Sequence, residues 1–232
     1  AGLHSQLAPR MFYVFESETI PGVYDELNQK LGFSKSMHFV IGYNWLIADN
    51  LRLKLESYFQ HLYDIPVKKG NPAYSMLNFG DNYFDQLPVI DSLVNDGKGK
   101  NYGIELTLEK FLDKGYYALI TGSLYQSKYK GFDGIERNTA FNGNFILNAL
   151  AGKEIMIRKK NFLSFNIRIL YAGSLRYVPY EIEQVAPHSF VQNFDWSKAY
   201  QNRRNDYFRI NGRLGYKLIR KKFNMELAVD LM

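Results

Sequence analysis

Residues 101–130 carry the pattern that most limits what this chain can fold into. Aliphatic and polar side chains alternate strictly over residues 104–109 (IELTLE), and a period of two is typical of a β-strand with one apolar and one polar face. Residues 112–115 (LDKG) supply a short turn, since glycine takes a positive φ at no steric cost. Residues 116–130 are rich in tyrosine, isoleucine, leucine and threonine. The stretch is therefore predicted to form a long β-hairpin with a very short turn.

The same arrangement of strand, short turn and returning strand recurs along the chain. The hairpins are separated by long segments rich in glycine, proline and asparagine. The expected strands lie in residues 1–16, 37–47, 51–63, 101–111, 116–130, 144–157, 161–171, 208–218 and 223–231. The expected long loops are residues 16–36, 65–100, 131–143 and 172–206. Short turns are thus predicted at one end of the strands and long loops at the other.

The strand lengths favour a membrane-spanning sheet. Most of the expected strands are near or above the roughly 10 residues that cross a bilayer at a tilt. Strands in soluble β-sandwiches have about five or six residues, and transmembrane barrels combine short turns at one end with long loops at the other. The predicted fold class is all-β, an antiparallel up-and-down transmembrane β-barrel.

Composition leaves two all-β interpretations open. Mean hydropathy is −0.31, and no run approaches the roughly 18 consecutive apolar residues of a membrane helix, which excludes a helical membrane protein. The aromatic content of 16% fits the aromatic girdles of a transmembrane barrel. It also fits a soluble β-sandwich in which aromatic residues pack the strands.

Charged side chains lie opposite the apolar ones in several expected strands. In a wide barrel they would line an aqueous lumen, whereas in a soluble sandwich they would face solvent. Glu226 and Asp230 follow the same pattern in the last strand. The residues predicted to face the lumen are Arg52, Lys54, Glu105, Glu109, Arg168, Arg209, Arg213 and Lys217.

The sequence resembles the late barrel strands of TonB-dependent outer-membrane receptors, most specifically over residues 93–153. The residues that carry the resemblance are 97–100 (GKGK), 102–105 (YGIE), 122–123 (GS), 127–129 (SKY) and 137–142 (RNTAFN). The closing stretch from 206–209 (DYFR) to 226–230 (ELAVD) is similar to the penultimate strands of that family. The resemblance implies a barrel of about 22 strands around a plug domain.

On this resemblance, residues 1–232 are expected to be a C-terminal part of the receptor barrel, about nine strands of the whole, without the plug domain and the closing strands. The implied function is nutrient uptake across the bacterial outer membrane. The implied partners are outer-membrane lipid, the receptor's own N-terminal plug domain, the TonB energy-coupling protein and an unknown extracellular nutrient. The alternatives are a secreted soluble β-sandwich that binds glycans and a passive porin-like barrel.

Ligand contact is expected in the long loops, where aromatic side chains could stack on a sugar or a chelate; they could equally pack the loops over the barrel mouth. The candidate ligand-binding residues are Tyr74, Tyr83, Phe84, Phe190, Phe194, Trp196 and Tyr200.

Catalytic, metal-binding and nucleic-acid-binding patterns are missing from the sequence. The chain has no cysteine, and its four histidines lack metal-ligand spacing. No nucleophile–base pair or paired carboxylates can be argued from spacing, so neither an enzyme nor a cofactor or metal site is predicted. The net charge is +6, but the basic residues are dispersed and cluster at turns, whereas nucleic-acid binding needs a continuous basic face.

Overall fold

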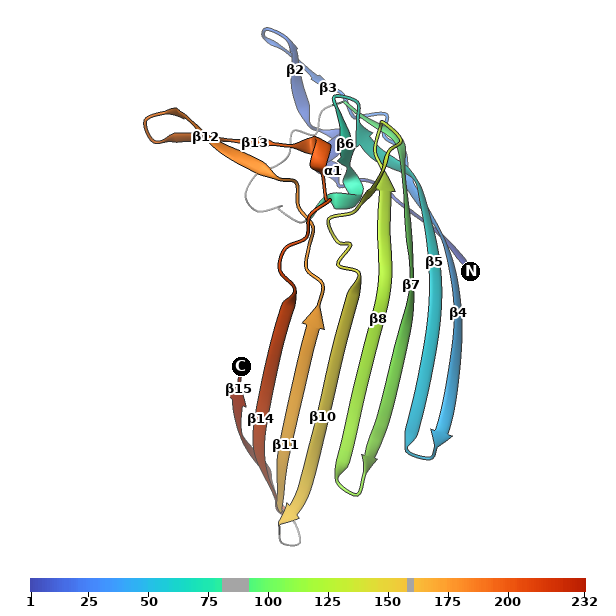
Figure 1. Cartoon of the computed structure of the whole chain (residues 1–232), viewed down its shortest axis with the longest axis vertical. Helices are drawn as coiled ribbons and strands as arrows, with labels where there is room; N and C mark the ends of the chain where they lie inside the picture. The colour runs from blue at the N-terminus through green and yellow to red at the C-terminus, as the bar shows by residue number, and fades with distance from the viewer. Residues whose placement is uncertain (81–91, 158–160) are drawn as a thin grey trace.

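One large antiparallel β-sheet makes up most of the molecule (Figure 1). The structure is a computed structural model that describes residues 1–80, 92–157 and 161–232. Nine strands form a path through the sheet in the order β1-β4-β5-β7-β8-β10-β11-β14-β15, so their order in the sheet follows their order in the sequence. The predicted all-β class and the antiparallel up-and-down order are confirmed. Within the described residues the sheet is open and does not close into a barrel.

The strands of this path are long, apart from those at its two edges. The nine strands are β1 (Gly2–Gln6), β4 (Ser34–Ala48), β5 (Leu51–Lys68), β7 (Leu93–Asp113), β8 (Tyr116–Lys130), β10 (Phe145–Ile157), β11 (Asn161–Ala172), β14 (Tyr207–Ile219) and β15 (Asn224–Leu231). Two short strands extend the sheet, β6 (Asn71–Ser75) beside β5 and β9 (Glu136–Asn138) beside β8.

Two small hairpins project from the sheet at one end (Figure 1). The first pairs β2 (Glu16–Ile20) with β3 (Val23–Glu26), and the second pairs β12 (Tyr180–Ala186) with β13 (Ser189–Phe194). The helical pieces are single turns, namely α1 (Arg10–Tyr13), η1 (Met76–Asn78) and η2 (Trp196–Lys198).

Short and long connections are segregated to opposite ends of the sheet. The turns after β4, β7 and β14 lie at one end, which we call the turn end, and the long connections and both small hairpins lie at the other, the loop end (Figure 1). In the β7–β8 turn, Lys114 and Gly115 have φ angles of 51° and 80°. Positive φ at both central residues is the geometry that matches the twist of two hairpin strands.

Several segments predicted to be loops contain strand. Residues 16–36 contain the β2–β3 hairpin, residues 172–206 contain β12 and β13, and residues 131–143 contain β9. The loop predicted over residues 65–100 is wrong at both ends, because β5 continues to Lys68 and β7 starts at Leu93. Conversely, residues 1–16 hold only the short β1 before the chain turns into α1.

The buried core of the described residues lies at the loop end and not between two sheets. One cluster joins Ala8, Phe12, Leu31 and Leu93 with partly buried aromatic neighbours. A second joins Ala73, Val178 and Ala199. In the part of the chain that the structure describes, no second sheet covers the large one. The long strands therefore keep both of their faces largely uncovered.

Candidate functional site

One face of the sheet is apolar from β4 to β15. Cross-strand registers align these side chains in rows, for example Tyr43 with Leu55 and Leu106. We call this side the apolar face. Its members are Phe39, Ile41, Tyr43 and Trp45 on β4, Leu53, Leu55 and Phe59 on β5, Tyr102, Ile104, Leu106 and Leu108 on β7, Ile120 and Leu124 on β8, Leu147 on β10, Phe165, Ile167, Ile169 and Tyr171 on β11, Phe208, Ile210 and Leu214 on β14, and Leu227 and Val229 on β15.

The apolar face is exposed along its whole width. Ile41 is 76% exposed at one side of the sheet, Leu124 is 69% exposed in the middle and Val229 is 61% exposed at the other side. A soluble monomer rarely leaves a contiguous apolar patch larger than a few hundred Å² uncovered. An exposed apolar surface across eight strands therefore marks a contact with lipid or with another molecule.

Lysines border the apolar face along β7. Lys100 precedes the apolar run and Lys110 follows it, ten positions further on. At about 3.3 Å per residue the two are about 33 Å apart along the strand. On β10, Lys153 lies beside the turn end, with its ammonium 4.6 Å from the centroid of the Tyr116 ring.

The opposite side of the sheet, which we call the polar face, carries all the residues predicted to line a lumen. Register places Arg52 opposite Glu109, Leu170 opposite Arg209, and Phe162 opposite Lys217, so aliphatic and aromatic side chains also stand on this side. The eight residues brought together on this face are Arg52, Lys54, Glu105, Glu109, Arg168, Arg209, Arg213 and Lys217.

Ion pairs join neighbouring strands across the polar face. Arg52 pairs with Glu109 across β5 and β7, and Arg213 reaches both Glu226, at 3.2 Å, and Asp230, at 3.5 Å, on β15. These side chains are partly exposed, so their free energies of interaction are screened by solvent. They form a mixed-charge surface that favours contact with water over contact with a hydrocarbon layer.

A chain of hydrogen bonds crosses the polar face near the loop end. The Gln60 side chain contacts His38 Nε2 at 2.8 Å and accepts from Asn101 Nδ2 at 2.7 Å. The Ser127 hydroxyl donates to Asn101 Oδ1 at 2.7 Å and accepts from Thr139 Oγ1 at 2.8 Å. The chain ties β4, β5, β7 and β8 to the connection that follows β9.

The connections at the loop end fold over the polar face and are held there by hydrogen bonds. Tyr129 projects from β8, is 1% exposed and donates to the Ala73 carbonyl at 2.6 Å. Arg176 reaches three segments, because its guanidinium donates to Asn142 O at 2.9 Å, to Asn144 Oδ1 at 2.9 Å and to Gln201 O at 2.8 Å. These contacts make the loop end an ordered cover.

The predicted ligand-binding aromatics separate into two groups. Tyr74 is packed into the first buried cluster, where burial raises the pKa of its phenol to about 12, and Tyr200 stacks edge-on against Tyr129 at 6.0 Å. Trp196 is partly buried beside the second cluster. These three side chains pack the cover, which was the alternative role considered for them. Tyr83 and Phe84 lie outside the described residues.

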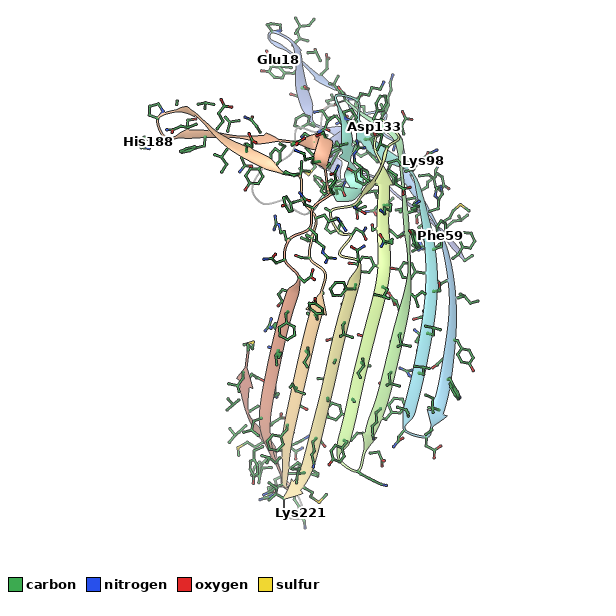
Figure 2. The ribbon with its side chains drawn as sticks, in the orientation of Figure 1. Glu18, Phe59, Lys98, Asp133, His188 and Lys221 are labelled. Atoms are coloured by element: carbon green, nitrogen blue, oxygen red, sulfur yellow. The ribbon has the colours of Figure 1, made fainter. Side chains whose placement is uncertain are left out.

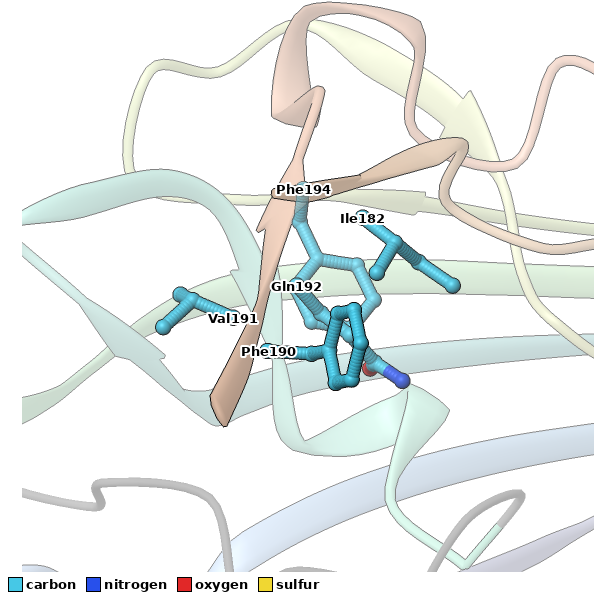
Figure 3. Close-up of a pocket in the computed structure, with 5 residues that line it drawn as sticks. All are labelled: Ile182, Phe190, Val191, Gln192 and Phe194. Atoms are coloured by element: carbon cyan, nitrogen blue, oxygen red, sulfur yellow. The ribbon is translucent and has the colours of Figure 1, made fainter. Parts of the chain in front are cut away.

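Phe190 and Phe194 are placed differently, on the projecting β12–β13 hairpin. With Ile182, Val191 and Gln192 they line an open concavity of about 610 Å³. Figure 3 shows Phe190, Phe194 and Ile182 on one side of the ribbon, with Val191 on the other. Phe194 also contacts Tyr180, with ring centroids 5.5 Å apart. Of the five described candidates, only these two remain available to a ligand.

Three further residues line this concavity and are not among the predicted ones, namely Ile182, Val191 and Gln192. For Ile182 the sequence holds a signal in the short alternation of residues 180–186 (YEIEQVA), which is typical of a strand although it lies within the predicted loop.

The described residues contain no group of three or more histidine or acidic side chains that could hold a metal ion. In the same part of the chain, no helix is long and apolar enough to cross a membrane. Comparisons with protein-family models, with curated proteins and with solved structures gave no match.

Proposed function

We propose that this chain is a nine-strand section of the wall of a transmembrane β-barrel in the bacterial outer membrane. In this proposal the apolar face contacts lipid, the polar face lines the lumen and the loop end faces the outside of the cell. The observation that carries the proposal is the exposed apolar face, which continues through eight strands while the opposite face is charged and ion-paired.

The height of the apolar face supports this proposal. The distance of about 33 Å between Lys100 and Lys110 along β7 becomes about 25 Å when the strand tilts by about 40°, which equals the apolar band of outer-membrane barrels. Lysines at the borders of such a band can reach the interface with their ammonium groups.

The soluble β-sandwich is the weaker candidate. A sandwich needs a second sheet packed about 10 Å from the first, and in the described residues the apolar face has no such cover. The barrel proposal has its own requirement, because β1 and β15 are open edges and open edges do not face lipid. Further strands must pair with them in the assembled barrel.

Single-cysteine accessibility tests the orientation of the two faces, and the absence of cysteine from this chain makes the test direct. Ile104→Cys and Leu106→Cys should react with a lipid-soluble maleimide in native membranes and resist a charged, water-soluble one. Glu105→Cys and Thr107→Cys, one position away on the same strand, should show the opposite preference. Equal reactivity of all four positions with the charged reagent would contradict the proposal.

For the transport role we propose energised uptake of a nutrient by a TonB-dependent receptor, and no catalytic activity. The resemblance described above supports this choice, and the proposed partners remain the plug domain and the energy-coupling protein. Spent growth medium from cells with and without the gene should differ in its content of one compound or class, measured by mass spectrometry. A protonophore should abolish that difference. A difference that survives the protonophore would favour the passive porin-like barrel.

A further inference from the structure

Four lysines gather on the apolar side of the sheet at its loop end. Register places Lys98 directly opposite Lys130, and Lys100 directly opposite Lys128. Like charges that face each other on neighbouring strands are unfavourable, because their Cβ atoms are only about 5 Å apart. We call these four residues the lysine patch. Two adjacent repulsive pairs therefore favour the binding of a negatively charged group.

Acidic side chains of the protein compensate only part of this charge. Lys100 Nζ lies 2.8 Å from Glu136 Oε2 on β9. The pKa of the Glu136 carboxyl is lowered, first by its hydrogen bond with Lys100 and further by the charges of Lys128 and Lys130, so a single carboxylate serves three ammonium groups. Asp96 precedes Lys98 by two positions on the same strand. Within the described residues, the other three patch lysines form no ion pair.

The lysine patch borders the apolar face directly. Tyr102 follows Lys100 on β7 two positions toward the turn end, and Leu124, 69% exposed, begins the apolar run on β8. Figure 2 shows Lys98 near the loop end and Phe59, a member of the apolar face, further down the sheet. His61 of β5 stands opposite Lys100 and extends the polar row by one strand. Positive charge and exposed hydrocarbon therefore meet on one surface.

We propose that the lysine patch binds the phosphate-bearing headgroup of an anionic lipid in the surrounding leaflet. This inference rests on the proposed function, because it takes the apolar face to be covered by lipid. The two rows of the patch are about 7 Å apart along the strands and about 5 Å apart across them, a spacing at which four ammonium groups can surround one or two phosphates.

The continuity of the patch with the apolar face selects a lipid over a free anion. An amphiphile places its acyl chains on Leu124 and Ile104 while its phosphate meets the ammonium groups. Inorganic phosphate can contact the ammonium groups but has no acyl chains to place on the apolar face. Juxtamembrane basic residues attract anionic headgroups by the same electrostatics in other membrane proteins.

The test uses the full-length receptor purified in neutral detergent, with lipid A carrying two phosphates as the probe. Native mass spectrometry counts the lipid A molecules retained as the probe is titrated. The variant K98Q/K100Q/K128Q/K130Q should bind lipid A at least tenfold more weakly than the wild type. The variant K98R/K100R/K128R/K130R, which keeps the charge, should restore binding. Removing cross-strand repulsion favours the sheet, so the Gln variant should remain folded, as judged by its mobility on an unheated gel.

The matched control is K54Q/K217Q, which removes lysines from the polar face and should leave lipid A binding unchanged. Equal binding by the wild type and the Gln variant overturns the inference. Tight binding of inorganic phosphate, or equal retention of phosphatidylcholine, also overturns it. The cysteine experiment distinguishes failure of this inference from failure of the proposed function. If positions 104 and 106 prove to be exposed to lipid but the lysine patch does not bind lipid A, only the lipid site is refuted.

Discussion

At the scale of single residues, Gly152 shows how side chains on the polar face cross a strand. Tyr117 on β8, Gly152 on β10 and Asn166 on β11 stand in one cross-strand row. The Tyr117 hydroxyl donates to Asn166 Oδ1 and passes over the glycine to do so. A Cβ atom on Gly152 would lie 2.3 Å from Tyr117 Cζ and 2.4 Å from Asn166 Oδ1. Because Gly152 has no side chain, it leaves room for the contact between β8 and β11.

Gly152→Ala should therefore displace the Tyr117 ring and break its hydrogen bond with Asn166. Overpacking of this kind costs about 1–3 kcal/mol in the free energy of unfolding, measurable by urea titration of the protein in lipid vesicles. Gly122→Ala is the control, since its Cβ would meet only Leu147 Cδ1, at 4.0 Å. Equal stability of the two variants would show that the crossing contact contributes nothing.

The assignment of residues to faces could be predicted from the sequence, because alternation depends only on the order of side chains along one strand. Arg52 and Glu105 were placed on a common polar side in this way, and the register agrees. The lysine pairs could not be predicted. Lys98 and Lys130 are 32 positions apart, and only the register between β7 and β8 makes them neighbours.

At the scale of elements, β7 is a long strand whose first residues the sequence does not predict. Residues 97–100 (GKGK) were read as loop because glycine weakens a strand. In the structure both glycines lie within β7 and serve close packing, since a Cβ on Gly97 would lie 2.7 Å from the Ile65 carbonyl and one on Gly99 would lie 2.6 Å from Leu77 Cδ1. The sequence of one strand does not show that the backbone or side chain of another segment approaches it so closely.

The two faces of β7 should respond differently to an introduced charge. Leu106 lies on the apolar face between Lys100 and Lys110, so Leu106→Arg places a guanidinium near the middle of the proposed bilayer. The expected cost is about 2–4 kcal/mol in the free energy of unfolding in lipid vesicles. Thr107→Arg, on the polar face, should cost about 0.5 kcal/mol or less. A Leu106→Arg variant as stable as Thr107→Arg would argue that the apolar face does not meet lipid.

At the scale of the whole molecule, the nine-strand order was predictable because long alternating runs and short turns are local signals. The two small hairpins were missed since their strands, such as Val23–Glu26, are short and sit in polar surroundings. The cover at the loop end was equally invisible. Contacts such as Arg176 with Asn142 and Gln201 join segments that no periodic pattern connects.

The proposed location can be checked on the native protein. A peptide from residues 101–130, followed by mass spectrometry through cell fractionation, should be recovered in the detergent-extracted outer membrane. The physical reason is the exposed apolar face, which would remain uncovered if the protein were surrounded by water. Recovery of the peptide in the soluble fraction would end the barrel proposal and return attention to the glycan-binding sandwich.

The order of the strands has a consequence for assembly. Because each of the nine strands of the path pairs with the strand of the path that precedes it in sequence, the sheet can grow one hairpin at a time, and no early contact must wait for a distant part of the chain. Every added hairpin, however, creates a new open edge and a wider apolar strip at the same moment. A chain built in this way gains nothing by completing its sheet in water. Under the barrel proposal it should reach the membrane unfolded, and its pairing and its insertion should then be a single event.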